Sequence, residues 1–191
     1  MKIKIVQIEH LTKEYEDEVV LRDKVLRKPL GLAYTKEQLL EEKDEIHFVA
    51  YDEEKIVGCL LLKILPNNIL KMRQVAIDFD YQSKGIGKLL VEHSEKFALL
   101  NGFTEIEMHA RDTAVPFYLK LGYEIVSEKF MEVTIPHFKM KKKNKINLFH
   151  LTFLKSYLTV CKIQFDIISR ANGENVSSSC PYSATVQVLH S

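Results

Sequence analysis

The sequence RQVAIDFDYQSKGIGKLL, residues 73–90, contains a strand, a turn and the start of a helix. An apolar run ends at Ile77, a polar turn follows, and a long amphipathic pattern begins after Gln82. Gly85 and Gly87 stand where the helix should begin, and a glycine there lets backbone N–H groups approach a ligand without a Cβ in the way. The first helical turn also leaves N–H groups unpaired and partly positive. The stretch therefore predicts a binding site for a phosphate or a pyrophosphate.

The spacing of these glycines excludes two common phosphate-binding motifs. A dinucleotide fingerprint needs a third glycine at the position of Leu90. A nucleotide-triphosphate loop needs four residues between its glycines and then Lys-Ser or Lys-Thr, whereas here a single residue separates them and Leu89 follows Lys88. The pattern that remains is Gln-x-x-Gly-x-Gly directly after a strand.

This pattern resembles the pyrophosphate loop of the GNAT superfamily of acyl-CoA-dependent N-acyltransferases. In that loop, Arg or Gln is followed by two residues, Gly, any residue, and then Gly or Ala, and Gln82, Gly85 and Gly87 match it position by position. A second signature of the same family follows downstream in AVPFYLKLGY, residues 114–123. The resemblance covers all of the chain except its last part, 144–191.

The composition is compatible with one globular domain of ordinary solubility. The chain has 191 residues, of which 46% are hydrophobic, and its formal net charge of +1 argues against nucleic acid or an acidic membrane surface as the main partner. Cys59, Cys161 and Cys180 are sparse and lack metal-ligand spacing, so we expect no metal site and a reduced, cytoplasmic protein. The N-terminus alternates polar and apolar residues and lacks the apolar core of a signal peptide.

The order of the predicted elements indicates an α+β domain with one mixed, mostly antiparallel sheet and helices on both of its faces. Strands are expected at residues 3–8, 46–51, 55–65, 69–77, 103–110, 123–135 and 138–143, the last two joined around Pro136-His137. Helices are expected at residues 11–26, 34–43, 83–101 and 113–121. Thr35, with Gln38 three residues later, predicts a capping box for the second helix. In the family that the chain resembles, the strand before the glycine loop and the next parallel strand separate, and the pantetheine arm enters between them.

We expect the acetyltransferase-like domain to comprise residues 1–143, with 144–191 as a C-terminal extension. Residues 148–168 are apolar, but charged residues such as Lys162 interrupt them, so we expect no membrane span. Two alternatives stay open for the extension. It is either an amphipathic helix followed by a disordered end, or a poorly specified segment without a catalytic part, which we favour.

The resemblance implies transfer of an acetyl group from acetyl-CoA to a primary amine. The loop amides would bind the pyrophosphate, and the pantetheine would pair with the preceding strand, where one backbone N–H would polarise the thioester carbonyl. Arg111 stands where many relatives carry an asparagine that contacts the cofactor. The expected cofactor contacts are Val75, Ala76 and Ile77 in the strand, Gln82, Ser83, Lys84, Gly85, Ile86, Gly87 and Lys88 in the loop, and Arg111 and Phe117 further on.

The acceptor amine must lose a proton, and the leaving thiolate must gain one. A lysine-like amine is neutral to only about one part in two thousand at pH 7, so a base matters. Some relatives place a glutamate base on the strand before the loop, where this chain has Lys71. His109 is a candidate base, but a resemblance of the segment from residue 130 to a hairpin signature in one branch of the family favours His137 and Glu132. Tyr118 is the expected proton donor to sulfur, because the family places its helix beside the thioester.

Two functions stay open: an N-acetyltransferase acting on a small molecule or a peptide, and a non-catalytic acyl-CoA-binding module. Tyr118 separates them, because a pure binding module has no need for a phenol at the thiolate. The expected partners are acetyl-CoA and an unidentified amine, and a homodimer is left open. Residues 26–43, the specificity-setting region, carry no charge pattern that names the acceptor.

Overall fold

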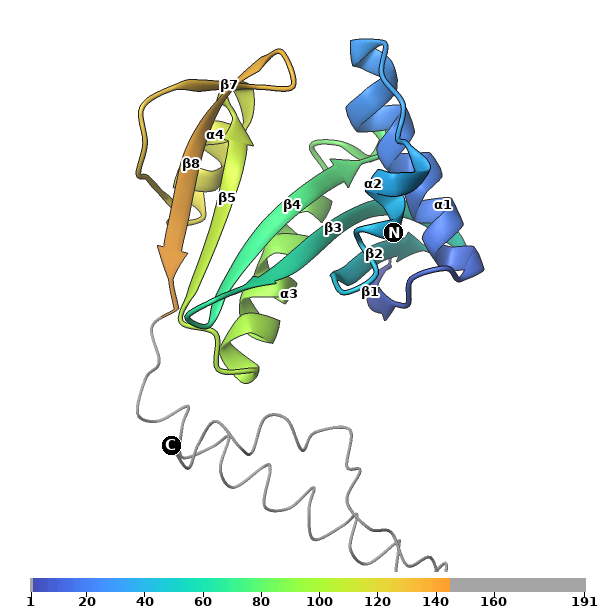
Figure 1. Cartoon of the computed structure of the whole chain (residues 1–191). Coiled ribbons are helices and arrows are strands. Elements are labelled where there is room, and N and C mark those ends of the chain that lie inside the picture. Colours follow the sequence, from blue (N-terminus) through green and yellow to red (C-terminus); the bar gives the residue numbers. More distant parts are fainter. Residues whose placement is uncertain (1, 145–191) are drawn as a thin grey trace, which may run out of the picture.

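A computed structural model of the chain describes residues 2–144 (Figure 1). These residues form one eight-stranded sheet in the order β1-β2-β3-β4-β5-β8-β6, with β7 paired to β8. The predicted extension, 144–191, lies outside the described residues except for Asn144. The strands are β1 (Ile3–Ile8), β2 (Ile46–Asp52), β3 (Lys55–Leu65), β4 (Ile69–Ile77), β5 (Glu105–Arg111), β6 (Glu124–Ile125), β7 (Phe130–Glu132) and β8 (Ile135–Lys143).

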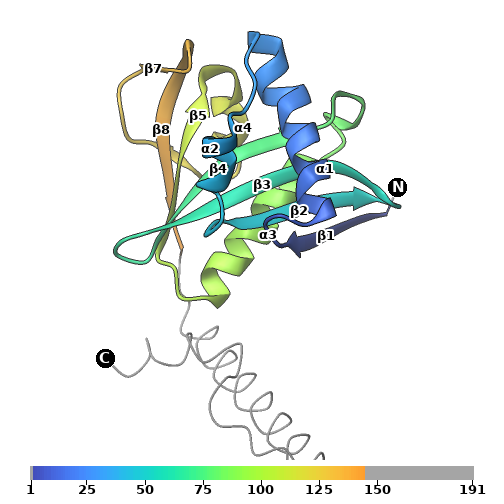
Figure 2. The ribbon, with the colours of Figure 1, turned by 45° about the vertical axis from the view of Figure 1, so that its right-hand side comes forward.

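Helices cover both faces of the sheet, as predicted. The π-helical turn η1 (Asp23–Arg27) and the 3-10 turn η2 (Lys28–Leu30) continue α1 (Lys13–Arg22). The other helical elements are α2 (Lys36–Leu40), η3 (Phe79–Tyr81), α3 (Ile86–Leu100), η4 (Asp112–Ala114) and α4 (Val115–Lys120). Figure 2 shows α1 and α3 on opposite sides of the central strands. The capping box predicted for α2 is present: the Thr35 hydroxyl accepts from Gln38 N–H, and the Gln38 side chain accepts from Thr35 N–H.

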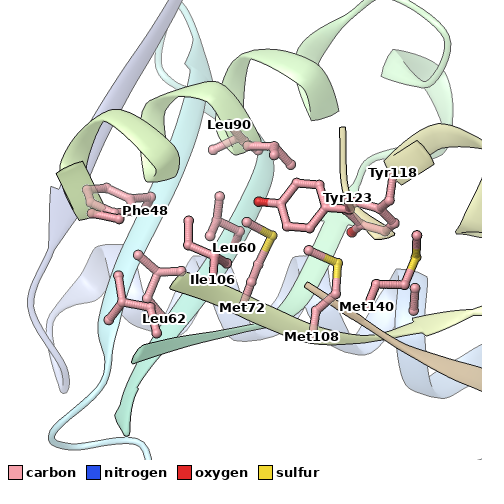
Figure 3. Close-up of a cluster of buried hydrophobic side chains, with 14 of the residues drawn as sticks. Phe48, Leu60, Leu62, Met72, Leu90, Ile106, Met108, Tyr118, Tyr123 and Met140 are labelled. Atoms are coloured by element: carbon pink, nitrogen blue, oxygen red, sulfur yellow. The ribbon is translucent and has the colours of Figure 1, made fainter. Parts of the chain in front are cut away.

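The core has two parts because alternate side chains of a strand point to opposite faces. On the α3 face, α3 and α4 bury Leu90, Val91 and Tyr118 against β3, β4, β5 and β8. Figure 3 shows Leu90 beside the strand residues of this cluster, with Tyr118 near Met140. On the opposite face, α1 packs on the smaller cluster that contains Cys59 and Ala76. The α+β class and the mixed, mostly antiparallel sheet are thus confirmed.

A buried ionic cluster attaches α1 and the segment after α2 to this second face. The Arg22 guanidinium donates to both Glu42 carboxylate oxygens at 2.7 and 2.8 Å, and all of these atoms are buried. Glu18 lies 2.8 Å from His47 on β2. Because removal of one partner would leave a buried charge uncompensated, this cluster holds the N-terminal helices in a defined position on the sheet.

The sheet opens between β4 and β5, as the resemblance implied. These strands pair in parallel from Ile69↔Glu105 to Met72↔Met108 and then diverge, although β4 continues to Ile77 (Figure 1). A bulge at this point shifts the register between β3 and β4, and Gln74 adopts a φ of 54° there. The extra residue bends β4 away from β5, as bulges commonly do.

The last hairpin differs from the prediction. Its turn lies at Val133 and Thr134, with φ values of 49° and 63°, and β8 already begins at Ile135. Two consecutive positive φ values match the right-handed twist of a tight hairpin, so the chain turns here even without Asn or Gly. Pro136 is tolerated near the start of a strand, and His137 therefore lies inside β8, paired with Phe130 and Arg111. The predicted strand 123–135 is divided into β6 and β7.

Candidate active site

A cavity of about 990 Å³ occupies the opening between β4 and β5. Its walls come from β4, the loop before α3, the end of β5, α4, the end of η1 and the β7–β8 hairpin. Most of the predicted site residues line it: Val75, Ile77, Gln82, Ser83, Gly85, Ile86, Gly87, Lys88, Arg111, Phe117, Tyr118, Glu132 and His137. Ala76 and Lys84 are not among the lining residues. Ala76 is buried against the α1 face, and the Lys84 ammonium lies 4.9 Å from the centre of the Tyr81 ring.

The glycine loop forms the floor of the cavity at the N-terminus of α3. The predicted helix start at Ser83 is too early, because Ser83 and Gly85 have φ values of 61° and 83° and α3 begins at Ile86. Gly85 is the N-cap, in a left-handed conformation that strains any residue with a Cβ. A Cβ on Gly87 would lie 3.5 Å from Phe117 and 3.7 Å from Ile77, so a larger side chain would fill the cavity. No acidic residue lies in the first turn of α3, which leaves the positive end of the helix available to an anion.

The edge of β4 that faces the cavity is an open strand edge. Ala76 and Ile77 pair with β3 on their other side, and the pairing with β5 ends at Met72. An extended ligand can add to such an edge as a further strand, with main-chain hydrogen bonds. Gln82 supports this corner, because its side-chain amide donates to the Ile77 carbonyl at 3.2 Å.

Tyr118 lies at the inner end of the cavity. Its side chain is 6% exposed and packs edge-on against Phe117 and Tyr123, with ring centroids 4.9 and 5.7 Å away. Burial raises the pKa of its phenol, which therefore stays protonated at neutral pH. Within residues 2–144 the Tyr118 hydroxyl has no hydrogen-bond partner, and Tyr118 is one of the residues that line the cavity. A protonated donor without a protein acceptor is available to a ligand.

The opposite wall carries two imidazoles and a carboxylate. His109 Nδ1 lies 2.8 Å from Glu132 Oε2, across β5 and β7. The Phe130 ring contacts His109 edge-on at 5.0 Å and stacks on His137 at 6.1 Å. His137 is buried, and its Nδ1 lies 2.8 Å from the Ile135 carbonyl and donates to it. The sequence favoured His137 over His109, but the structure brings His109 together with Glu132.

Gln74 and Arg27 are among the cavity residues that the sequence analysis missed. Gln74 occupies the bulge and accepts a hydrogen bond from the Tyr34 hydroxyl at 2.7 Å. Arg27, at the end of η1, lines the cavity with its guanidinium 4.5 Å from the centre of the Tyr34 ring. A bulge has no clear sequence signal when no glycine marks it, and an arginine in a loop gives no sign of what it faces.

The fold agrees with what comparison with known proteins shows. Residues 11–144 match the family model of the acetyltransferase (GNAT) domain. The chain therefore belongs to the GNAT acetyltransferases, a family of acyl-transfer enzymes. A Bacillus subtilis protein described as an uncharacterized N-acetyltransferase, YjcF, is 31% identical over 130 residues, which cover 68% of this chain and 92% of that protein.

Solved structures show the same fold. An acyl-CoA N-acyltransferase from Pseudomonas aeruginosa superposes with a TM-score of 0.64 at 21% identity, over 74% of this chain and 99% of that one. The paiA N-acetyltransferase of Thermoplasma acidophilum, solved in complex with coenzyme A, gives a TM-score of 0.58 at 19% identity, over 75% of this chain and 99% of that one. At these identities the likeness concerns the fold alone.

None of the helices within residues 2–144 combines the length and the apolar character that crossing a bilayer requires. Within the same part of the chain, no group of His, Cys, Asp and Glu side chains is arranged to hold a metal ion.

Proposed function

We propose that this protein is an N-acetyltransferase that transfers the acetyl group of acetyl-CoA to a primary amine by direct attack. The observation that carries the proposal is the meeting, in one cavity, of the glycine loop, the open edge of β4 and the unpartnered phenol of Tyr118. A pyrophosphate fits the N-terminus of α3, and a pantetheine arm fits the open strand edge.

The residues that would hold acetyl-CoA follow from this arrangement. Backbone N–H groups of the loop from Gln82 to Lys88 bind the phosphates, with Lys84 and Lys88 adding positive charge. The backbone of Val75, Ala76 and Ile77 pairs with the pantetheine arm. Phe117 of α4, which lies beside the start of α3, packs against the same arm. Acetyl-CoA supplies the activated thioester. The cytoplasmic location and the homodimer stay predictions.

Two groups then move the protons. Glu132 accepts from Nδ1–H of His109, which leaves His109 Nε2 as the basic nitrogen that takes the proton from the amine. The new C–N bond forms as the C–S bond breaks, and Tyr118 offers its phenolic proton to the departing sulfur. His137 donates through Nδ1 to Ile135, and so its Nε2 is the second candidate base.

Release of free thiol from acetyl-CoA, measured with a mixture of amines, tests the proposal. We expect thiol release that depends on an amine, together with an equal amount of acetylated amine detected by mass. Tight binding of acetyl-CoA without thiol release with any amine would favour the alternative, a non-catalytic acyl-CoA-binding module.

A further inference from the structure

Two arginines in the cavity wall have no acidic partner among residues 2–144. Arg27 ends η1 and Arg111 ends β5, and both line the cavity. Among residues 2–144, the other two arginines each have a carboxylate: Arg22 lies 2.7 Å from Glu42, and Arg73 lies 2.6 Å from Glu45. Arg27 and Arg111 form no ion pair within that part of the chain. A guanidinium that is partly buried without a counter-ion is a costly arrangement, and such an arrangement is typical of a binding site for an anion.

The side chain of Arg111 reaches the backbone next to Arg27. Arg111 Nη2 donates to the carbonyl of Leu26, the residue before Arg27, at 3.3 Å. This contact crosses the opening from the end of β5 to the end of η1. Burial lowers the pKa of Arg111, Tyr34 raises it, and the positive charge of Arg27 lowers it.

Arg27 is held in place before any ligand binds. Its guanidinium lies over the Tyr34 ring at 4.5 Å, and the Tyr34 hydroxyl is fixed by its hydrogen bond to Gln74. The Nε atom of Arg27 is buried and has no hydrogen-bond partner within residues 2–144. A stacked guanidinium loses little further freedom when an anion binds, so its fork is preorganised.

Most of the charged side chains that line the cavity are positive. Its carboxylate is Glu132, whereas its cations are Arg27, Lys63, Lys71, Arg73, Lys88 and Arg111. Glu132 is occupied by His109, and Lys88 and Arg73 have acidic partners in the protein. The other cations of the lining are Arg27, Lys63, Lys71 and Arg111. Their positive potential repels polycationic acceptors, such as polyamines and aminoglycosides, and attracts anionic ones.

We propose that the acceptor is an amine that also carries an acidic group, a carboxylate or a phosphate, bound between Arg27 and Arg111. The end of η1, reached from α1, and the β7–β8 hairpin stand at the same end of the sheet on either side of the opening (Figure 1). An acceptor of this kind spans the gap with its anion on the arginines and its amine toward His109 and Glu132. This inference rests on the proposed N-acetyltransferase function and names the class of its substrate.

Matched acceptors test the inference directly. Initial rates are measured for an amino acid and its amide, for an aminoalkyl phosphate and its amino alcohol, and for spermidine. We expect kcat/KM to be at least about tenfold higher for the acidic member of a pair, the worth of one charge-assisted hydrogen bond. The amide has the less basic amine, so a site without an anion pocket would prefer it. The carboxylate and phosphate pairs together identify which anion the site takes.

Variants assign the preference to the two arginines. Arg27→Gln and Arg111→Gln should raise the KM of the acidic acceptor about tenfold and leave the KM of acetyl-CoA unchanged. Lys28→Gln is the matched control: it removes a positive charge one residue away, from a side chain that is 69% exposed and does not line the cavity. Arg27→Lys keeps the charge and should retain part of the preference for the acidic acceptor. Thermal unfolding checks that Arg27→Gln, Arg111→Gln and Arg27→Lys are folded.

Several outcomes would overturn the inference. One is equal kcat/KM for both members of every pair. Another is a rise confined to the KM of acetyl-CoA in Arg111→Gln, which would assign Arg111 to the cofactor, as the family resemblance implied.

If no amine is acetylated, the proposed function fails, and calorimetry on the CoA-saturated protein then decides the inference separately. Acid-selective binding that Arg27→Gln abolishes supports an anion pocket, and equal binding of the acid and the amide refutes it.

Discussion

At the scale of single residues, the phenol of Tyr118 carries the most specific prediction. Tyr118→Phe keeps the ring contacts with Phe117 and Tyr123 and removes a hydroxyl without a described partner, so stability should hardly change. Loss of a general acid typically costs about a hundred- to ten-thousand-fold in rate. We expect kcat to fall at least about tenfold, with little change in the KM for acetyl-CoA. Steady-state kinetics measure both.

Tyr123→Phe is the control for Tyr118→Phe. It removes a second buried tyrosine hydroxyl from the same core, but Tyr123 does not line the cavity, and so kcat should stay at the level of the unmodified protein. If Tyr118→Phe also keeps kcat within a factor of about two, proton delivery comes from elsewhere. Tyr118 would then be a core residue only.

The pairing of His109 with Glu132 predicts a pH-dependent defect. In His109→Gln the acceptor must reach the thioester already neutral, and the neutral fraction of an amine rises as pH approaches its pKa. The loss of kcat/KM should therefore be largest near pH 7 and shrink toward pH 10. A rate profile of His109→Gln beside His137→Gln distinguishes the two candidate bases. A defect of constant size across this range would exclude His109 from proton removal.

At the scale of elements, the loop before α3 should determine cofactor affinity. Gly85→Glu introduces both a strained left-handed residue, at a cost of about 1–2 kcal/mol, and a negative charge where phosphates are expected. We expect loss of acetyl-CoA binding by calorimetry, with the fold intact by circular dichroism.

Gly102→Glu is the matched control for this loop. Gly102 has a φ of +77° and open space around its Cβ position, but it follows the other end of α3. The Gly102→Glu variant therefore introduces the same backbone strain and the same negative charge, but at a place away from the cavity. If Gly85→Glu binds acetyl-CoA as tightly as Gly102→Glu and the unmodified protein do, the glycine loop is not part of the binding site.

At the scale of the whole molecule, residues 2–144 contain every element of the sheet and the cavity. Asn144 closes this unit, because its side chain donates to the Phe103 carbonyl and its backbone N–H donates to the Thr104 carbonyl, both at 2.8 Å. A chain that ends after Asn144 should therefore fold and bind acetyl-CoA like the full chain. A fall of many degrees in melting temperature on truncation would show that the remaining residues belong to the core.

Local chemistry explains which features the sequence could predict. Thr35 with Gln38 predicted a helix start without any partner far along the chain, and the capping box is present. Gln82, Gly85 and Gly87 predict an anion site from neighbouring residues in the same way, and that site stays a prediction. The features that were missed depend on distant contacts. The hairpin turn at Val133 and Thr134 follows from strand pairing rather than from turn residues.

The proposed anion site of Arg27 and Arg111 could not be predicted from the sequence either. Arg27 and Arg111 come from the first helix region and the fifth strand, and neither carries a local signal of its neighbour. Residues 26–43 carry no charge pattern that names an acceptor, because Arg111, one half of the proposed anion site, lies on β5. The pair exists only once β4 and β5 have separated and η1 has packed across the opening.

The most direct test of the account is the stoichiometry of acetyl transfer by the unmodified protein. Free thiol and acetylated amine are measured together, in one reaction that contains acetyl-CoA and a single carboxylate-bearing amine. We predict thiol release that requires the amine, equals the acetylated product, and falls at least about tenfold in Tyr118→Phe. Saturable binding of acetyl-CoA with no acetylated product, across neutral, cationic and acidic amines, would contradict it.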